Sequence, residues 1–292
     1  MTQATAQPRR HQATLALDAR ATLGECIRWD ERQRLIYWVD IPGRQLHRYD
    51  PATGRDDAMP LAQEMGCFAL AERGGFICGM RSGYARLDRF GGEFTSLASP
   101  DYDPARARFN DGRCDSAGRF WAGTMWEPRD RAGGIVYRLD ADGRFGAQCN
   151  PVIIANGITF APDGRSMTLA DTTNHVLWAF DYDLVTGIPS SRRELRSYEP
   201  ASGRPDGACV DAEGNVYVAI MAGGRVEKIS PTGELLALIE LPIPNITCCT
   251  FAGDDLRTLY ITTARTRMTD AELAAQARVQ RVAQAARGGE PS

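Results

Sequence analysis

The sequence predicts an all-β fold, a six-bladed β-propeller with a central metal site. Three observations lead to this prediction. Short strand-like segments dominate the chain, they recur with a period in the forties, and one polar position recurs at the same place in the repeat. A convincing amphipathic helix pattern occurs only near residues 269–286.

The predicted strands are short, rich in β-branched and aromatic residues, and bounded by Gly, Asp or Pro. They read LIYWVD, FICGM, FWAGTM, GIVYRLD, VLWAFDYD, VYVAI and TLYITTA. A long series of such strands with Gly-rich turns is typical of a sandwich, a barrel or a propeller.

The repeat decides between these folds. A polar residue, an apolar run and a turn glycine eight positions later recur in NDGRCDSAG, NGITFAPDG and DGACVDAEG. The same frame fits three further segments, so the predicted turns fall at positions 33, 75, 118, 164, 214 and 257. A period in the forties is typical of propeller blades, and six frames predict six blades. The alternative is a sandwich without a repeat.

One position in the repeat holds the candidate functional residues. The residue eight places before each turn begins the first strand of its blade, and in a propeller that strand lines the central channel. The six occupants are Glu25, Cys67, Asn110, Asn156, Asp206 and Cys249. We call this position the slot. Side chains in a shared register should converge on one axis, although each Asn-Gly or Asp-Gly taken alone is also a common turn pair.

Oxygen ligands without His or thiolate suit a hard cation. We therefore expect Glu25, Asn156 and Asp206 to hold one metal, with water in the remaining positions. Three protein ligands with open positions are typical of a catalytic site. Cys67 and Cys249 are expected to pack as channel wall, since thiols do not suit a calcium-like site.

The chain resembles the regucalcin/gluconolactonase family, also called the senescence-marker-protein and luciferin-regenerating family. The stretches that carry the resemblance are LGECIRWD, YWVDIPGRQLHRYDP, RFNDGRCDSAGRFWAGTM, NGITFAPDGRSMTLADT, RPDGACVDAEGNVYVA and LYITTAR. The resemblance implies a six-bladed propeller with one metal held by a Glu, an Asn and an Asp. Those positions fall on Glu25, Asn156 and Asp206. It also implies that Arg108 and Asn110 bind substrate hydroxyl or carbonyl groups.

The chain departs from the family pattern in two places. Relatives closest to regucalcin carry a substrate-contacting acid just after GTM, where this chain reads GTMWEPRD. Glu127 stands one place early and is the candidate substrate contact. Relatives also follow the C-terminal helix with a Gly-Gly-apolar strand, whereas this chain ends ARVQRVAQAARGGEPS.

The resemblance implies a metal-dependent lactonase that opens a small sugar lactone, such as gluconolactone or arabinonolactone, to the aldonic acid. One divalent ion (Ca²⁺, Zn²⁺, Mn²⁺ or Mg²⁺) would polarise the carbonyl. Asp206 is the candidate catalytic base, taking the proton of the attacking water. The alternatives are hydrolysis of another ester class and a calcium-binding propeller without catalysis.

Bulk features narrow the function classes. Lys and Arg number 34 against 37 Asp and Glu, so no basic footprint for nucleic acid is expected. There is no membrane-length apolar run and no signal-peptide pattern, so we expect a cytoplasmic protein, a monomer or weak homo-oligomer. The eight cysteines fit no zinc spacing and are expected to be buried thiols. GxSxG and GxGxxG motifs are absent from the sequence.

The expected organisation is a flexible N-terminal tail over 1–12, a propeller over 13–268, and a helical or disordered tail over 269–292. The alternating segment 13–19 is a candidate for the outer strand of the sixth blade. Since 276–292 shows no strand pattern, the sequence predicts that this blade is one strand short.

Overall fold

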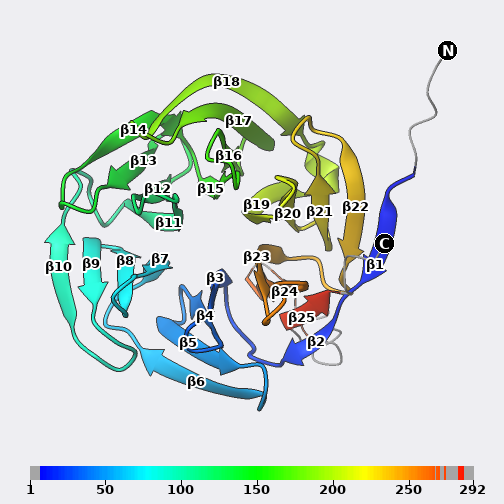
Figure 1. The fold of residues 1–292 in the computed structure, drawn as a ribbon, viewed down its shortest axis with the longest axis horizontal. Helices are drawn as coiled ribbons and strands as arrows, with labels where there is room; N and C mark the ends of the chain where they lie inside the picture. Colours follow the sequence, from blue (N-terminus) through cyan, green and yellow to red (C-terminus); the bar gives the residue numbers. More distant parts are fainter. Residues whose placement is uncertain (1–6, 267, 270–272, 274–281, 286–292) are drawn as a thin grey trace.

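Six β-sheets surround a central axis in the computed structural model, which describes residues 7–266, 268–269, 273 and 282–285 (Figure 1). Each sheet runs outward from an inner strand at the axis to an outer strand at the rim. The sheets follow one another around the ring in sequence order. A propeller results.

The sheets have these strands. The first contains β3 (Gly24–Asp30), β4 (Leu35–Asp40), β5 (Gln45–Asp50) and β6 (Arg55–Pro60). The second contains β7 (Met65–Leu70), β8 (Phe76–Met80), β9 (Gly83–Leu87) and β10 (Phe94–Ala98). The third contains β11 (Ala107–Cys114), β12 (Phe120–Trp126), β13 (Gly134–Leu139) and β14 (Phe145–Val152). The fourth contains β15 (Ala155–Phe160), β16 (Ser166–Asp171), β17 (Val176–Asp183) and β18 (Ile188–Ser197).

A short 3₁₀ helix, η1 (Pro200–Ser202), leads into the fifth sheet. That sheet contains β19 (Arg204–Val210), β20 (Val216–Met221), β21 (Arg225–Ile229), β22 (Leu235–Glu240) and β1 (Arg9–Gln12). The sixth contains β23 (Ile246–Ala252), β24 (Thr258–Thr263), β25 (Val282–Ala285) and β2 (Thr14–Leu17). No helix in the described part of the chain has the length and apolar character needed to cross a membrane.

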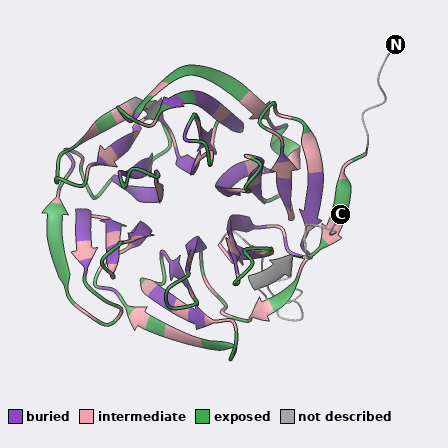
Figure 2. Cartoon of the chain, viewed as in Figure 1, coloured by how far each residue is buried: buried purple, intermediate pink, exposed green. Residues whose placement is uncertain are grey.

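Burial falls from the axis to the rim (Figure 2). Every residue of β12, a second strand, is buried, whereas the outer strand β10 is almost entirely exposed. Inner and second strands are covered on both faces by neighbouring sheets, so they read as continuous apolar runs without alternation. Outer strands face water and carry polar residues.

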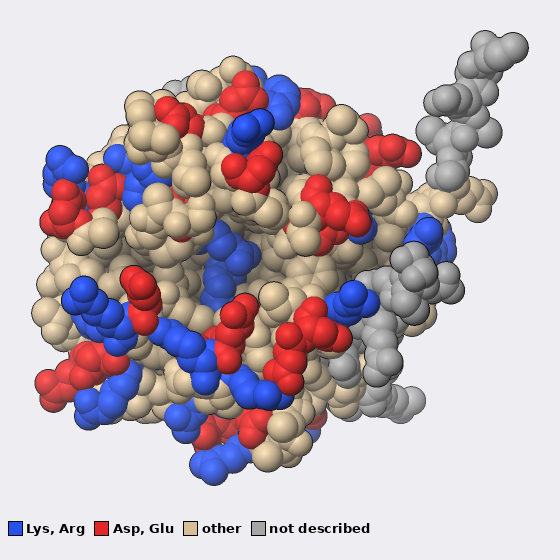
Figure 3. Space-filling model, in the orientation of Figure 1, with Lys and Arg blue, Asp and Glu red and all other residues tan. Residues whose placement is uncertain are grey.

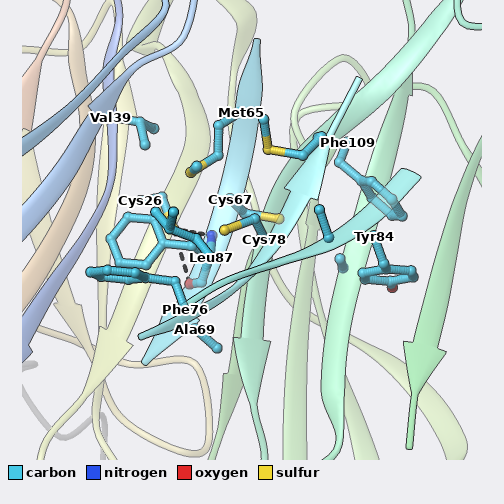
Figure 4. Close-up of a cluster of buried hydrophobic side chains, with 14 of the residues drawn as sticks. Cys26, Val39, Met65, Cys67, Ala69, Phe76, Cys78, Tyr84, Leu87 and Phe109 are labelled. Carbon is cyan, nitrogen blue, oxygen red and sulfur yellow. Dashed lines mark hydrogen bonds between the residues drawn. The ribbon is translucent and has the colours of Figure 1, made fainter. Parts of the chain in front are cut away.

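Apolar side chains between neighbouring sheets hold the ring together. Figure 4 shows one such cluster, in which Cys26 from β3, Cys67 from β7 and Phe109 from β11 pack together. The exposed fraction of these three side chains does not exceed 1%. Burying one large apolar side chain contributes about 1.5–3 kcal/mol. The sheet-to-sheet contacts therefore fix where the inner strands stand around the axis.

The sixth sheet corrects the predicted C-terminus. β25 pairs with β24 on one side and with β2 on the other, so the sheet has four strands and the prediction of a missing strand is wrong. The tail over 269–292 is therefore not wholly helical or disordered, although most of it lies outside the described residues. β2 is the outer strand, as the alternating segment 13–19 predicts.

The fifth sheet departs from the regular blade pattern. Five of the six sheets have four strands each, and the fifth sheet has five, because β1 adds in parallel to the edge of β22. An outer strand offers unpaired backbone groups, and β1 satisfies those of β22. Residues 9–12 therefore belong to the propeller and not to a flexible tail.

The predicted central metal site is also corrected. No group of three or more His, Cys, Asp or Glu side chains that could hold a metal occurs among the described residues. The physical reason lies in the composition of the slot, which contributes only two carboxylates beside two amides and two thiols.

Candidate functional site

All six slot residues predicted from the repeat are buried, with exposed fractions of 8% or less. They stand near the start of the inner strands, where pairing to the second strand is interrupted in every sheet. A β-bulge of this kind re-aims a side chain and is common beside functional sites.

The bulges fall into two classes. In β3, β15 and β19, two residues face one residue of the neighbouring strand. In β7, β11 and β23, one residue lacks a partner. The three strands of the first class carry Glu25, Asn156 and Asp206, so the backbone itself distinguishes the strands with the predicted metal ligands.

The bulges also correct the repeat frame in two sheets. The unpaired residues in β7 and β23 are Gly66 and Thr247, in place of the predicted Cys67 and Cys249. A strand can gain a residue at a bulge without any change in its turn, so a bulge shifts the frame. Cys67 and Cys249 are completely buried, as expected of channel wall.

Glu25 and Asp206 place two carboxyl groups in the buried centre. Burial raises the pKa of Glu25 well above its usual value, and the nearby carboxylates of Asp206 and Asp111 raise it further. Burial likewise raises the pKa of Asp206, with Asp111 as the next cause. Oδ1 of Asp206 is buried without a hydrogen-bond partner among the described residues. A cation placed here would relieve both the repulsion and the unsatisfied oxygen.

Asp111 is a functional neighbour that the sequence analysis missed. Its Oδ1 accepts a 2.8 Å hydrogen bond from the Gly112 amide, and its Oδ2 accepts one of 3.2 Å from the Ile158 amide. The negative charge of Asp111 raises the pKa of both Glu25 and Asp206. Its place in the Asn110-Asp111-Gly112 triplet was the signal that could have identified it.

Asn156 is held by its neighbours on both sides. Its Oδ1 accepts a 2.7 Å hydrogen bond from Nδ2 of Asn110, and its Nδ2 donates one of 2.8 Å to Oγ1 of Thr172. An amide oxygen has two lone pairs, so one remains for a metal. The predicted ligand set of two carboxylates and one amide therefore fits a hard cation.

Arg108 and Asn110 lie beside this centre. Nη1 of Arg108 donates a 3.0 Å hydrogen bond to Oδ1 of Asn110, and Asn110 in turn donates to Asn156. Burial lowers the pKa of Arg108. The predicted substrate-binding residues and the predicted metal ligand Asn156 thus form one chain of hydrogen bonds.

Glu127 is the most exposed of the predicted site residues, and Arg81, which sequence reasoning missed, holds it in place. Arg81 donates to both of its oxygens, at 2.8 and 2.9 Å, and also to Glu64 at 2.8 Å. Nε of Arg108 lies 3.7 Å from Glu127 and 3.8 Å from Glu64. These four residues form an alternating network of charges. Glu64 and Arg81 fall outside the repeated slot, and no sequence signal marked them.

Comparisons with known proteins identify the family of the chain. Residues 23–265 match the family described as the SMP-30/Gluconolactonase/LRE-like region. The chain is 45% identical over 255 residues to the 6-deoxy-6-sulfogluconolactonase of Pseudomonas putida, covering 87% of each chain. It is 36% identical over 251 residues to the regucalcin of Gallus gallus, covering 84% of each.

The fold has a solved counterpart. A calcium-binding protein, regucalcin, from Agrobacterium tumefaciens superimposes with a TM-score of 0.88 at 27% identity, covering 97% of this chain and 95% of the other. The family match spans most of the chain, and the relatives are covered over most of their length. The chain belongs to the SMP-30/gluconolactonase/LRE-like family.

Proposed function

We propose that this protein is a metal-dependent lactonase that opens a small sugar lactone to its aldonic acid. The observation that carries the proposal is the buried Oδ1 of Asp206, which lacks a hydrogen-bond partner among the described residues and lies near the carboxyl group of Glu25. The names of the relatives support the same class, since the Pseudomonas putida relative is called a 6-deoxy-6-sulfogluconolactonase.

We propose Glu25, Asn156 and Asp206 as the residues that would hold one divalent ion. When bound, such an ion supplies Lewis-acid polarisation of the lactone carbonyl. Calcium is the first ion to test, because the Agrobacterium tumefaciens neighbour is described as a calcium-binding protein. Zn²⁺, Mn²⁺ and Mg²⁺ are the other candidates.

The remaining roles belong to the side chains. Asp206 would accept the proton of the attacking water at its carboxylate. The second lone pair of Oδ1 in Asn110 can accept a hydroxyl of the sugar. Arg108, held against Asn110, would orient the ring oxygens with its rigid donor fork. Glu127 would contact substrate from the rim, oriented by Arg81.

The test is acid release from a lactone panel in weak buffer, with chelated protein and each metal added separately. The panel contains gluconolactone, arabinonolactone and 6-deoxy-6-sulfogluconolactone, together with an aryl ester and a phosphotriester. We expect metal-dependent opening of at least one sugar lactone. Full activity in chelator contradicts the metal role, and turnover of only the other esters contradicts the substrate class.

A calcium-binding protein without catalysis is the second candidate, favoured by the description of the Agrobacterium tumefaciens neighbour. It makes a different prediction from the lactonase. Calorimetry would then detect one bound Ca²⁺ per chain, while no compound in the panel releases acid with any metal.

A further inference from the structure

A cavity lies on the axis, farther along the inner strands than the candidate metal centre. Its volume is about 360 Å³, and its lining includes Arg28, Arg113, Thr159 and Cys209. Each of these residues follows its predicted slot residue by three positions in the sequence. Since a strand rises about 3.3 Å per residue, the cavity lies roughly 10 Å along the channel from the slot.

Figure 3 shows a hollow at the centre of one face of the propeller, with basic side chains inside it. Arg28 and Arg113 are the only basic residues among the described residues that line the cavity. They come from β3 and β11, which lie on different sheets of the ring. The channel therefore has a carboxylate-rich part at the slot and an arginine-lined cavity beyond it.

Backbone carbonyls, and not acidic side chains, hold the two arginines in place. Arg28 is buried and donates to the carbonyl oxygens of Ile27 at 2.7 Å and Gly112 at 2.5 Å. Arg113 donates to the carbonyl of Ala208 at 2.6 Å, and its buried Nε has no partner among the described residues. These backbone carbonyls are uncharged, so they hold the guanidinium groups in place and leave their positive charge.

Two carboxylates lie near the arginines. Glu31 lines the cavity, and Asp111 lies 3.8 Å from Arg28 while both of its oxygens accept backbone amides. Burial and then the positive charge of Arg28 lower the pKa of Arg113. The buried Nε of Arg113, unpartnered in the described part of the chain, is therefore the feature that favours a bound anion.

We propose that this cavity binds a small oxyanion between Arg28 and Arg113, of the chemical class of phosphate, sulfate or a short carboxylate. The guanidinium fork matches the paired oxygens of such groups, and hydrogen bonds between charged partners are about twice as strong as neutral ones. The volume admits a small anion and excludes a polymer. The site is separate from the lactonase centre, and it does not rest on the proposed function.

The first experiment is calorimetric titration of the full chain with inorganic phosphate and, separately, acetate at constant ionic strength set with chloride. We expect saturable binding of one anion per chain. Arg113→Gln should weaken it at least about tenfold, since a charge-assisted hydrogen bond is lost. The matched control is Arg86→Gln, which removes another half-buried arginine that donates to a backbone carbonyl, that of Gly74. This control should bind like the unchanged protein.

A second variant keeps the proposal testable if Arg113→Gln does not fold. Glu31 also lines the cavity and is exposed, so Glu31→Gln removes a repelling charge at little cost to folding. It should tighten anion binding by about two- to fivefold. Phosphate binding alone identifies a tetrahedral ligand, and acetate binding alone identifies a carboxylate. Binding of neither anion, or equal binding by Arg113→Gln and unchanged protein, overturns the proposal.

Discussion

Nδ2 of Asn110 on β11 donates a 2.7 Å hydrogen bond to Oδ1 of Asn156 on β15, across the boundary between two sheets. This bond orients the amide oxygen that we propose as a metal ligand. A residue that positions a ligand in this way usually affects metal affinity nearly as much as the ligand does.

Asn110→Ala should therefore weaken Ca²⁺ binding by about 10–100-fold, as loss of a metal-orienting partner typically does. Calorimetric titration of the chelated protein measures the change. Asn215→Ala is the control, since Asn215 is an equally buried amide that bonds to Asp211 in a turn between strands. If both variants bind Ca²⁺ alike, Asn110 does not position the metal site.

Asp206→Asn should fold, keep weakened metal binding, and lose at least about 100-fold in lactone turnover, because the amide keeps an oxygen ligand but cannot take a proton. Glu25→Gln should act through metal affinity and be partly rescued by excess metal. Turnover measured across a metal titration separates the two. Near-normal turnover of Asp206→Asn at saturating metal would leave Asp206 a ligand only.

Removing the metal should lower the melting temperature. Without a cation, the buried carboxyl groups of Glu25 and Asp206 face each other with raised pKa values. A ligand that binds only the folded state stabilises it by about 2.7 kcal/mol at 100 times its Kd. Thermal unfolding in chelator and in graded Ca²⁺ measures this. A Glu25→Gln, Asp206→Asn double variant should lose the dependence, and an unchanged melting temperature in the original chain would argue against a metal.

Glu127→Gln should change stability in a pH-dependent way. The Arg81 guanidinium holds the pKa of Glu127 below its usual value, so the ion pair stabilises the folded state above the unfolded pKa of about 4.3. That contribution disappears as the pH falls through the lower folded pKa. The variant should melt earlier than the original chain near neutral pH and match it in strong acid. A constant difference across the pH range would point to lost packing instead.

Gly66→Ala should destabilise the ring. A Cβ at Gly66 would lie 2.0 Å from the carbonyl oxygen of Phe109, so two inner strands would have to separate. Overpacking of this kind typically costs about 1–3 kcal/mol, and a clash with backbone belongs at the upper end. Gly146→Ala is the control, because the nearest atom to its Cβ, Nε2 of Gln148, would lie 3.8 Å away. Denaturant unfolding compares the two, and equal stability would show that the strands can shift without cost.

The repeat made much of the fold and part of the site predictable. Turn glycines such as Gly118 and Gly164 have positive φ angles of 81° and 67°, which few other residues adopt, so their spacing reports the blades directly. The shared position of Glu25, Asn156 and Asp206 within the repeat then identified the strands that carry them. Their metal role stays a prediction.

The remaining structural features have weaker signals in the sequence. β25 reads VAQA, which has little strand propensity, and it forms because β2 and β24 offer backbone partners on both sides. Glu64 and Arg81 meet only after the sheets pack, since neither stands in the repeated slot. Bulges shift the frame in β7 and β23, and alternation alone does not reveal a bulge.

The pairing of β2 with β25 has a consequence for how the chain folds. Thr14 stands opposite Gln284, so nearly the entire polypeptide separates the two strands that complete the sixth sheet. Contacts of such high sequence separation are costly in loop entropy and form slowly. During synthesis from the N-terminus, the earlier sheets can assemble in turn, but β2 must wait until β25 has left the ribosome. Ring closure is therefore the step most exposed to premature termination, and a chain cut before Val282 would leave the edges of β2 and β24 open to other chains.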